Sequence, residues 1–331
     1  MNTFGRLFRV TMFGESHGQI VGVVIEGCPA GLPLEENELE FDLERRKAGK
    51  KGTTPRKESD SPKIKSGVFN GKTTGAPIVI EFENKNVDSS SYEKIKNTPR
   101  PGHADFVAFQ KFHGFNDYRG GGHFSGRLTT GLVAAGVVAK KLVAPSKIEA
   151  KLTEVGGSND IEKNVETAIS EGDSIGGIVE CKIDEVPIGL GEPFFDSVES
   201  LISHIIFSIP AIKGIEFGSG FASAKMKGSE CNDAIIDRNG KTTTNNAGGI
   251  NGGLTNGNEI VFRVVVKPTS SIGKEGKTID LKTNKNTEIR VEGRHDSCIA
   301  LRIPVVVEAV AAIVFADLML LEQKIPRIWR D

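Results

Sequence analysis

Two helix-length segments that are apolar on nearly every face constrain the fold of this 331-residue chain more than any other feature. Residues 127–142 and 304–321 are rich in Ala, Gly and Val, and helices of such small apolar residues pack closely in a protein core. The second segment invites comparison with a membrane span, but Glu308 and Asp317 interrupt its apolar run. We therefore expect two core helices and no membrane-spanning segment.

Runs of β-branched residues surround these helices and do not alternate strictly with them. The strand candidates are residues 7–13, 20–25, 76–82, 177–183, 259–271 and 288–293. This order favours an α+β fold, a β-α-β sandwich of antiparallel sheets around central core helices. A polar loop containing glycine precedes each core helix (GGGHFSGR and EGRHDSC), which suggests an internal pseudo-twofold relationship. We expect a single domain over residues 1–331.

Two further helices are expected outside this core. Residues 33–49 are acidic in the early turns and end in Arg45, Arg46 and Lys47, which complements the helix dipole. The residues that follow, 47–65, are rich in Gly, Lys, Thr, Ser and Pro, which predicts a cationic loop able to cover a site. In the second helix, over residues 192–209, His204 lies among apolar residues and is expected to pack rather than react.

Charge and cysteine content narrow the classes of function. With 42 basic and 43 acidic residues, the net charge of -1 provides no general attraction to nucleic acid or to a membrane surface. The four cysteines are far apart and include no Cys-x-x-Cys pair, which argues against a zinc site and a disulfide framework. The N-terminal residues MNTFGRLFRV lack the apolar core of a secretion signal. These features predict a cytoplasmic protein without a structural metal.

The pentapeptide GESHG at residues 14–18 fits the G-x-S-x-G spacing of a hydrolase nucleophile elbow. In an elbow, the serine lies on a strained turn between an incoming strand and an outgoing helix. Here β-branched residues 20–25 follow the motif, and they predict a second strand instead. Ser16 is therefore a poor candidate nucleophile, and His17 is the better candidate for the functional residue of this loop.

Four of the six histidines lie in polar loops rich in glycine, where binding and catalytic residues are commonly placed. They are His17, His103, His123 and His295. Five arginines lie close to these loops or to other glycines: Arg46, Arg100, Arg119, Arg127 and Arg294. Because planar guanidinium groups suit phosphate and carboxylate, this clustering predicts a cationic cavity for a small, multiply anionic ligand. The KPTSS segment at residues 267–271 ends a strand with donors that suit a phosphate or the edge of a flavin.

Taken together, these segments resemble the chorismate synthase family over nearly the whole chain. The similarity is carried by FGESHGQIVGVVIEGCPAG, LERRKAG, TTPRKESD, SGVFNGKTTGAPI, RPGHADF, DYRGGGHFSGR, EGDSIGG, VPIGLGEPFFDS, AIKGIEFGSGF, NNAGGINGG, KPTSS and GRHDSCIALRIPVVVEA. The resemblance implies a cytoplasmic carbon–oxygen lyase of the shikimate pathway. Such an enzyme removes phosphate and a ring proton from 5-enolpyruvylshikimate 3-phosphate in an anti-1,4 elimination and yields chorismate.

The resemblance also implies reduced FMN (FMNH2) as cofactor, although no net oxidation occurs, and a homotetramer. The flavin of this family is thought to lend an electron that helps phosphate to leave. No segment resembles a separate flavin reductase domain, so an external flavin reductant is expected.

Site roles follow from the resemblance at matching positions. His17 would be the acid near the reduced flavin, His103 would assist near the leaving phosphate, and Asp296 would be the base. The residues expected to bind substrate anions are Arg46, Lys51, Arg100, Arg127 and Arg294. The residues expected to contact FMN are His123, Phe124, Ser125, Ala211, Gly252, Lys267, Pro268, Thr269, Ser270, Ser271 and Arg294.

The chain departs from the family pattern at three places. Relatives mostly read GGGRSSAR where this chain has His123 and Phe124, so we expect weaker or more pH-dependent binding of the flavin phosphate. Pro210 replaces an amide residue, and Lys51 or Gly52 replaces an arginine. Two alternatives remain at this point: a serine hydrolase that uses Ser16, and a non-catalytic protein that binds a flavin or a phosphoester.

Overall fold

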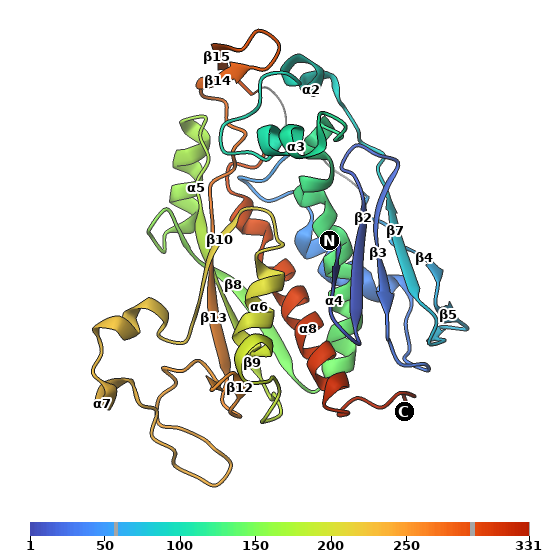
Figure 1. Ribbon diagram of the computed structural model, residues 1–331, viewed down its shortest axis with the longest axis vertical. Coiled ribbons are helices and arrows are strands. Elements are labelled where there is room, and N and C mark those ends of the chain that lie inside the picture. Colours follow the sequence, from blue (N-terminus) through green and yellow to red (C-terminus); the bar gives the residue numbers. More distant parts are fainter. Residues whose placement is uncertain (56–58, 292–294, 331) are drawn as a thin grey trace.

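A pair of long helices forms the centre of the computed structural model, which describes residues 1–55, 59–291 and 295–330 (Figure 1). Helix α4 (Thr129–Val143) packs along α8 (Pro304–Leu321), and nearly all of their side chains are buried. The two backbones approach so closely that a Cβ atom built on Gly136 would lie 2.3 Å from Cβ of Ala309. The prediction of two core helices of small residues is confirmed.

One antiparallel sheet covers the α4 side of this pair. Its strand order is β1-β2-β3-β7-β4, with bounds Thr3–Phe4, Arg9–Gly14, Ile20–Glu26, Ile78–Glu83 and Lys63–Ser66. Alternate residues of β3 and β7 face the core, where Val21, Val23 and Ile25 are fully buried. The period-2 pattern of the sequence therefore places one face of the sheet on α4.

A second antiparallel sheet covers the α8 side in the same way. Its order is β10-β13-β9-β8, with bounds Ile212–Phe217, Ile260–Val266, Gly177–Asp184 and Lys147–Val155. Each half thus consists of an antiparallel sheet on one long helix, and a short 3-10 turn precedes each helix, η3 (Gly126–Leu128) and η6 (Ile299–Arg302). The α+β sandwich is confirmed, and the two halves share the plan that the paired loops suggested.

The remaining elements carry loops and edges. They are η1 (Glu36–Leu39), α1 (Glu40–Arg46), β5 (Val68–Phe69), β6 (Lys72–Thr73), α2 (Ser90–Ile95), α3 (Asp105–Phe112), η2 (Arg119–Phe124), α5 (Ile161–Ser170), η4 (Phe194–Asp196), α6 (Val198–Ile206), η5 (Gly220–Lys225), α7 (Gly228–Cys231), β11 (Ile250–Asn251), β12 (Leu254–Thr255), β14 (Gly276–Asp280) and β15 (Lys285–Ile289).

These elements also test the more local predictions. The helices expected over residues 33–49 and 192–209 correspond to η1 with α1 and to η4 with α6. His204 stacks edge-on against Phe4, with ring centroids 5.4 Å apart, which fits packing. The strand predicted over residues 288–293 was wrong at residues 290 and 291, because β15 ends at Ile289, and residues 292 and 293 lie outside the described residues.

The two acidic residues that interrupt α8 are buried and fully engaged. Glu308 accepts hydrogen bonds from Arg45, from Lys140 and from the backbone N–H of Ala150. Asp317 accepts three backbone N–H groups, from residues 6–8. By length and composition α8 could cross a membrane, but 83% of its apolar window is buried inside the protein. Glu308 and Asp317 therefore anchor α8 to neighbouring segments within the core.

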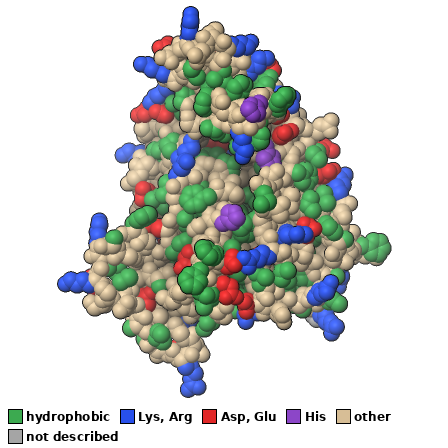
Figure 2. All heavy atoms as spheres, viewed as in Figure 1, with side chains coloured by type: hydrophobic (Ala, Val, Ile, Leu, Met, Phe, Trp, Pro, Cys, Tyr) green, Lys and Arg blue, Asp and Glu red, His purple; other side chains and the backbone are tan. Residues whose placement is uncertain are grey.

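On the face of the molecule drawn in Figure 2, the described acidic and basic side chains are interspersed.

Candidate active site

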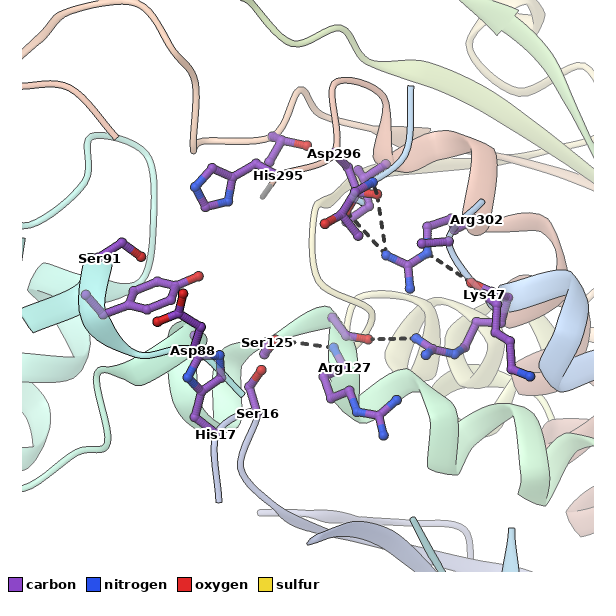
Figure 3. A pocket seen from close by; sticks show the side chains of 18 of the residues that line it. Ser16, His17, Lys47, Asp88, Ser91, Ser125, Arg127, His295, Asp296 and Arg302 are labelled. Atoms are coloured by element: carbon purple, nitrogen blue, oxygen red, sulfur yellow. Dashed lines mark hydrogen bonds and ion pairs between the residues drawn. The ribbon is translucent and has the colours of Figure 1, made fainter. Parts of the chain in front are cut away.

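A cavity of about 710 Å³ lies where the loops before α4 and α8 meet the β2–β3 loop and the segment after α1. It brings together residues that are far apart in the sequence (Figure 3). The predicted site residues that line it are His17, Arg46, Arg100, Ser125, Arg127, Thr269 and Asp296. His295, which was noted above only for its position in a polar loop, lines the cavity as well.

His17 forms one wall. It lies in the hairpin loop between β2 and β3, so the chain leaves the GESHG motif in a strand and not in the helix of a nucleophile elbow. The imidazole is buried, and its Nδ1 is hydrogen-bonded to the hydroxyl of Ser89 at 2.8 Å. The ring of Tyr92 meets it edge-on, with centroids 5.3 Å apart. These contacts fix the ring orientation, which acid–base chemistry requires.

Asp296 forms the opposite wall, and its side chain points into the same space as His17 (Figure 3). Its Oδ1 accepts the backbone N–H of Thr54 at 2.9 Å, and its Oδ2 lies 3.3 Å from Nη1 of Arg302. Its neighbour Arg294, which the resemblance assigned to anion and flavin binding, lies outside the described residues. Arg302 therefore supplies a nearby positive charge that the sequence had not assigned.

Arg46 and Arg127 also line the cavity, and they share one carboxylate. Asp60 Oδ2 accepts from Arg46 Nη2 at 2.8 Å, and Asp60 Oδ1 accepts from Arg127 Nη1. Burial acts to raise the pKa of Asp60, but the charges of the two guanidinium groups outweigh it and lower that pKa. Burial lowers the pKa of Arg46, against the opposing effect of Asp60, although an arginine stays protonated in proteins.

Arg100 joins His103 to this region. The Asp105 carboxylate accepts from Arg100 Nε at 2.7 Å and lies 2.7 Å from Nδ1 of His103. Against the effect of burial, these hydrogen bonds hold the pKa of Asp105 well below its usual range. His103 itself does not line the cavity, and it lies behind Gly121, whose built Cβ would be 3.4 Å from Cε1 of the ring. His103 is therefore held at the margin of the site.

The KPTSS segment reaches the site through Thr269. The Thr269 hydroxyl is buried at the cavity and has no hydrogen-bond partner among the described residues. Ser271 accepts from Arg100 Nη1, while Lys267 and Ser270 donate to the carbonyl of Gly102. Pro268 is exposed between them. The segment thus ties the two flanking loops together and presents one unused donor to a ligand.

Several residues predicted to contact FMN surround the cavity without lining it. His123 hydrogen-bonds the carbonyl of Gly14 at 2.8 Å and lines an adjoining cavity of about 270 Å³ with Ser125. Phe124 packs near Phe112, with ring centroids 6.4 Å apart, and Ala211 accepts the backbone N–H of Lys267. Their positions are compatible with a ligand that extends beyond the main cavity.

Two predicted residues lie away from the cavity. Gly252 is in the turn between β11 and β12, and β12 lies at the opposite end of the molecule from α2 and α3 (Figure 1). The side chain of Lys51 is mostly exposed and pairs with Glu166 of α5, so a substrate-binding role does not fit its position. The resemblance placed Lys51 or Gly52 where relatives have an arginine, but here the loop turns outward and Lys50 and Lys51 are exposed.

The sequence reasoning also missed residues that build the site. These are Asp60, Ser89, Tyr92, Asp105 and Arg302. For Asp60 a signal existed, namely an acidic residue at the end of the charged segment TTPRKESD, which follows the basic residues 45–47. Among the described residues, no group of three or more His, Cys, Asp or Glu side chains is arranged to hold a metal ion.

Comparison with known proteins agrees with this geometry. The family model for chorismate synthase matches residues 8–320. A chorismate synthase of Chitinophaga pinensis is 64% identical over 332 residues and covers 100% of both chains, and one of Thermococcus gammatolerans is 46% identical over 344 residues, covering 96% of this chain and 97% of its own. A crystal structure of chorismate synthase is similar at a TM-score of 0.73 and 26% identity, covering 96% of this chain and 93% of the other. The chain therefore belongs to the chorismate synthase family.

Proposed function

We propose that the His17–Asp296 cavity is where 5-enolpyruvylshikimate 3-phosphate loses phosphate and a ring proton to give chorismate. Family membership makes the chain a lyase of the shikimate pathway, which serves aromatic amino acid biosynthesis. The observation that supports this site best is the convergence of His17, Asp296, Arg46 and Arg127 on one cavity. An imidazole, a carboxylate and guanidinium groups are the parts that the elimination requires.

Each side chain has a role that its surroundings support. Arg46 and Arg127 would bind anionic groups of the substrate, and a well-placed donor in a water-poor site stabilises developing negative charge by about 3 kcal/mol. Asp296, beside Arg302, would accept the ring proton. His17, oriented by Ser89, would hold or deliver a proton at the opposite wall. His103, whose Nδ1 lies 3.1 Å from Nη2 of Arg100, would assist near the leaving phosphate.

Two features of the cavity support reduced FMN as the cofactor. Thr269 presents a buried hydroxyl without a partner among the described residues, and Ser125 also lies on the cavity wall. We propose that these two residues, with Lys267, Ser271 and the neighbouring His123, hold the flavin. When bound, reduced FMN would supply electron density that assists the departure of phosphate.

The assembly and the supply of flavin are part of the same proposal. One hydrophobic cluster joins both sheets to α4 and α8, which supports a single domain over residues 1–331. We propose that reduced FMN comes from an external source. Gly252 could reach a flavin in this cavity only from another copy of the chain, which is compatible with the expected homotetramer. Free cysteines support a cytoplasmic location.

Two other functions lead to different experimental outcomes. A serine hydrolase would be labelled at Ser16 by a fluorophosphonate, but Ser16 is buried and lies in a strand-to-strand loop. A non-catalytic binding protein would bind flavin and substrate without turnover. Retained phosphate release without fluorophosphonate labelling would exclude the hydrolase.

A binding experiment tests the shared cavity. Oxidised FMN is titrated by fluorescence with and without the phosphorylated substrate. We expect the affinity for FMN to increase when substrate is present, because the two ligands would fill one cavity and each would shield the other from water. Equal flavin affinity in both titrations would argue against a common site.

A further inference from the structure

Asp60 places one carboxylate between two arginines of the cavity, Arg46 and Arg127. Its own side chain is 1% exposed, although it lies on the long loop between α1 and β4. One carboxylate oxygen faces each guanidinium group. A single side chain therefore fixes the positions of two arginines that line the cavity.

The charge of this group differs from that of the other ion pairs at the cavity. Arg100 is paired with Asp105, and Arg302 is paired with Asp296, one carboxylate for one guanidinium. Asp60 is shared, because its carboxylate pairs with both Arg46 and Arg127. Buried charge is unfavourable unless partners compensate it, and an anionic ligand group in the cavity would add to that compensation.

Arg46 also has an unused donor. Its Nη2 donates to Asp60 and its Nη1 contacts Thr129, but its buried Nε has no hydrogen-bond partner among the described residues. The anion could therefore bind while Asp60 keeps its place. This favours a lasting positioning role for Asp60 over one in which the ligand displaces it.

The backbone supports the same interpretation. Asp60 has a φ of 46°, in the left-handed region that non-glycine residues rarely adopt. A strained backbone conformation of this kind is retained where the surrounding contacts hold the residue in place. The same loop donates the N–H of Thr54 to Asp296. One loop therefore contacts both the arginine pair and the proposed base.

We propose that Asp60 is a positioning residue for substrate binding, which orients Arg46 and Arg127 toward one anionic group and limits their combined charge so that the anion can leave after reaction. This inference rests on the proposed function and adds a residue that sets the affinity and geometry of the anion site. Asp60 acts through the arginines, so its loss alters anion binding and turnover in opposite directions.

The test measures the affinity for inorganic phosphate by calorimetry, together with kcat and KM, for the full chain. Asp60→Asn keeps the shape but removes the negative charge, so we expect about 10-fold tighter phosphate binding and a kcat lowered about 10-fold or more. Asp60→Glu restores the charge at the wrong distance, so its phosphate affinity should stay close to that of the wild type while its kcat remains low.

Asp42→Asn provides the matched control. Asp42 is a buried aspartate paired with Arg45 and Lys140 outside the cavity, so its loss should change thermal stability but neither phosphate affinity nor kcat. Unchanged or weaker phosphate binding in Asp60→Asn would overturn the inference. If the wild-type protein binds phosphate but produces no chorismate, the proposed function is contradicted. The comparison of phosphate affinities between the wild type and Asp60→Asn would still test the role of Asp60.

Discussion

Gly120 lies directly against His17, because a Cβ atom built on Gly120 would be 2.6 Å from Nε2 of the imidazole. No side chain can occupy this position without displacing the ring or moving the loop. The glycine-rich segment before α4 therefore packs against His17, the proposed acid, and helps to fix its position.

Replacement of Gly120 by alanine should lower turnover by about 10-fold or more through displacement of His17. Gly157→Ala is the matched control, since Gly157 also has a positive φ but no atom lies within 4 Å of its built Cβ. Both variants should lose roughly 1 kcal/mol of stability from backbone strain. Equal rates for the two variants would show that the contact with His17 is unimportant.

Loss of either proposed proton-transfer group should reduce the rate strongly. His17→Ala and Asp296→Asn are each expected to lower kcat by about 10²-fold, a typical contribution of general acid–base catalysis. His113→Ala serves as the control, because His113 is exposed at the end of α3, lines neither cavity and should keep normal turnover. Near-normal kcat for either cavity variant would refute the role assigned to that residue.

Ser89 should influence catalysis only through His17. Because its hydroxyl is hydrogen-bonded to Nδ1 at 2.8 Å, Ser89→Ala would remove one of the contacts that orient the ring. We expect kcat to fall about 10-fold with little change in KM, a scale reasonable for lost orientation. Steady-state kinetics decide the matter, and a change confined to KM would point to substrate binding instead.

The core helices could be predicted because their signals are local, whereas much of the site could not. A helix that is apolar on all sides requires burial, so the composition of residues 127–142 and 304–321 is enough to identify the core. The polar loops that carry His17 and Asp296 were likewise recognisable as parts of one site. Asp60, Ser89 and Arg302 were missed because their roles depend on partners that only the fold brings close. The family resemblance misled for Lys51, because a matching position in a loop does not determine the direction of a side chain.

Stability should depend on pH through Glu308 in the core. Burial acts to raise its pKa, but hydrogen bonds and charges from Arg45 and Lys140 lower it overall. A lowered folded-state pKa means that this stabilisation is present above about pH 4.3, the ordinary glutamate value, and is lost as the pH falls through the folded-state pKa.

Glu308→Gln should therefore cost about 3 kcal/mol near neutral pH and show a smaller loss of stability in acid than the wild type. Denaturant unfolding at several pH values measures both effects. Glu288→Gln, at an exposed position on β15, should match the wild type throughout. An acid profile of Glu308→Gln as steep as that of the wild type would contradict the role of this carboxylate.

The most direct test of the proposed active site is an anaerobic assay with 5-enolpyruvylshikimate 3-phosphate and dithionite-reduced FMN. We predict that phosphate and chorismate appear together in equal amounts, and only when reduced flavin is present. Binding of flavin and substrate without release of phosphate would contradict the proposed function.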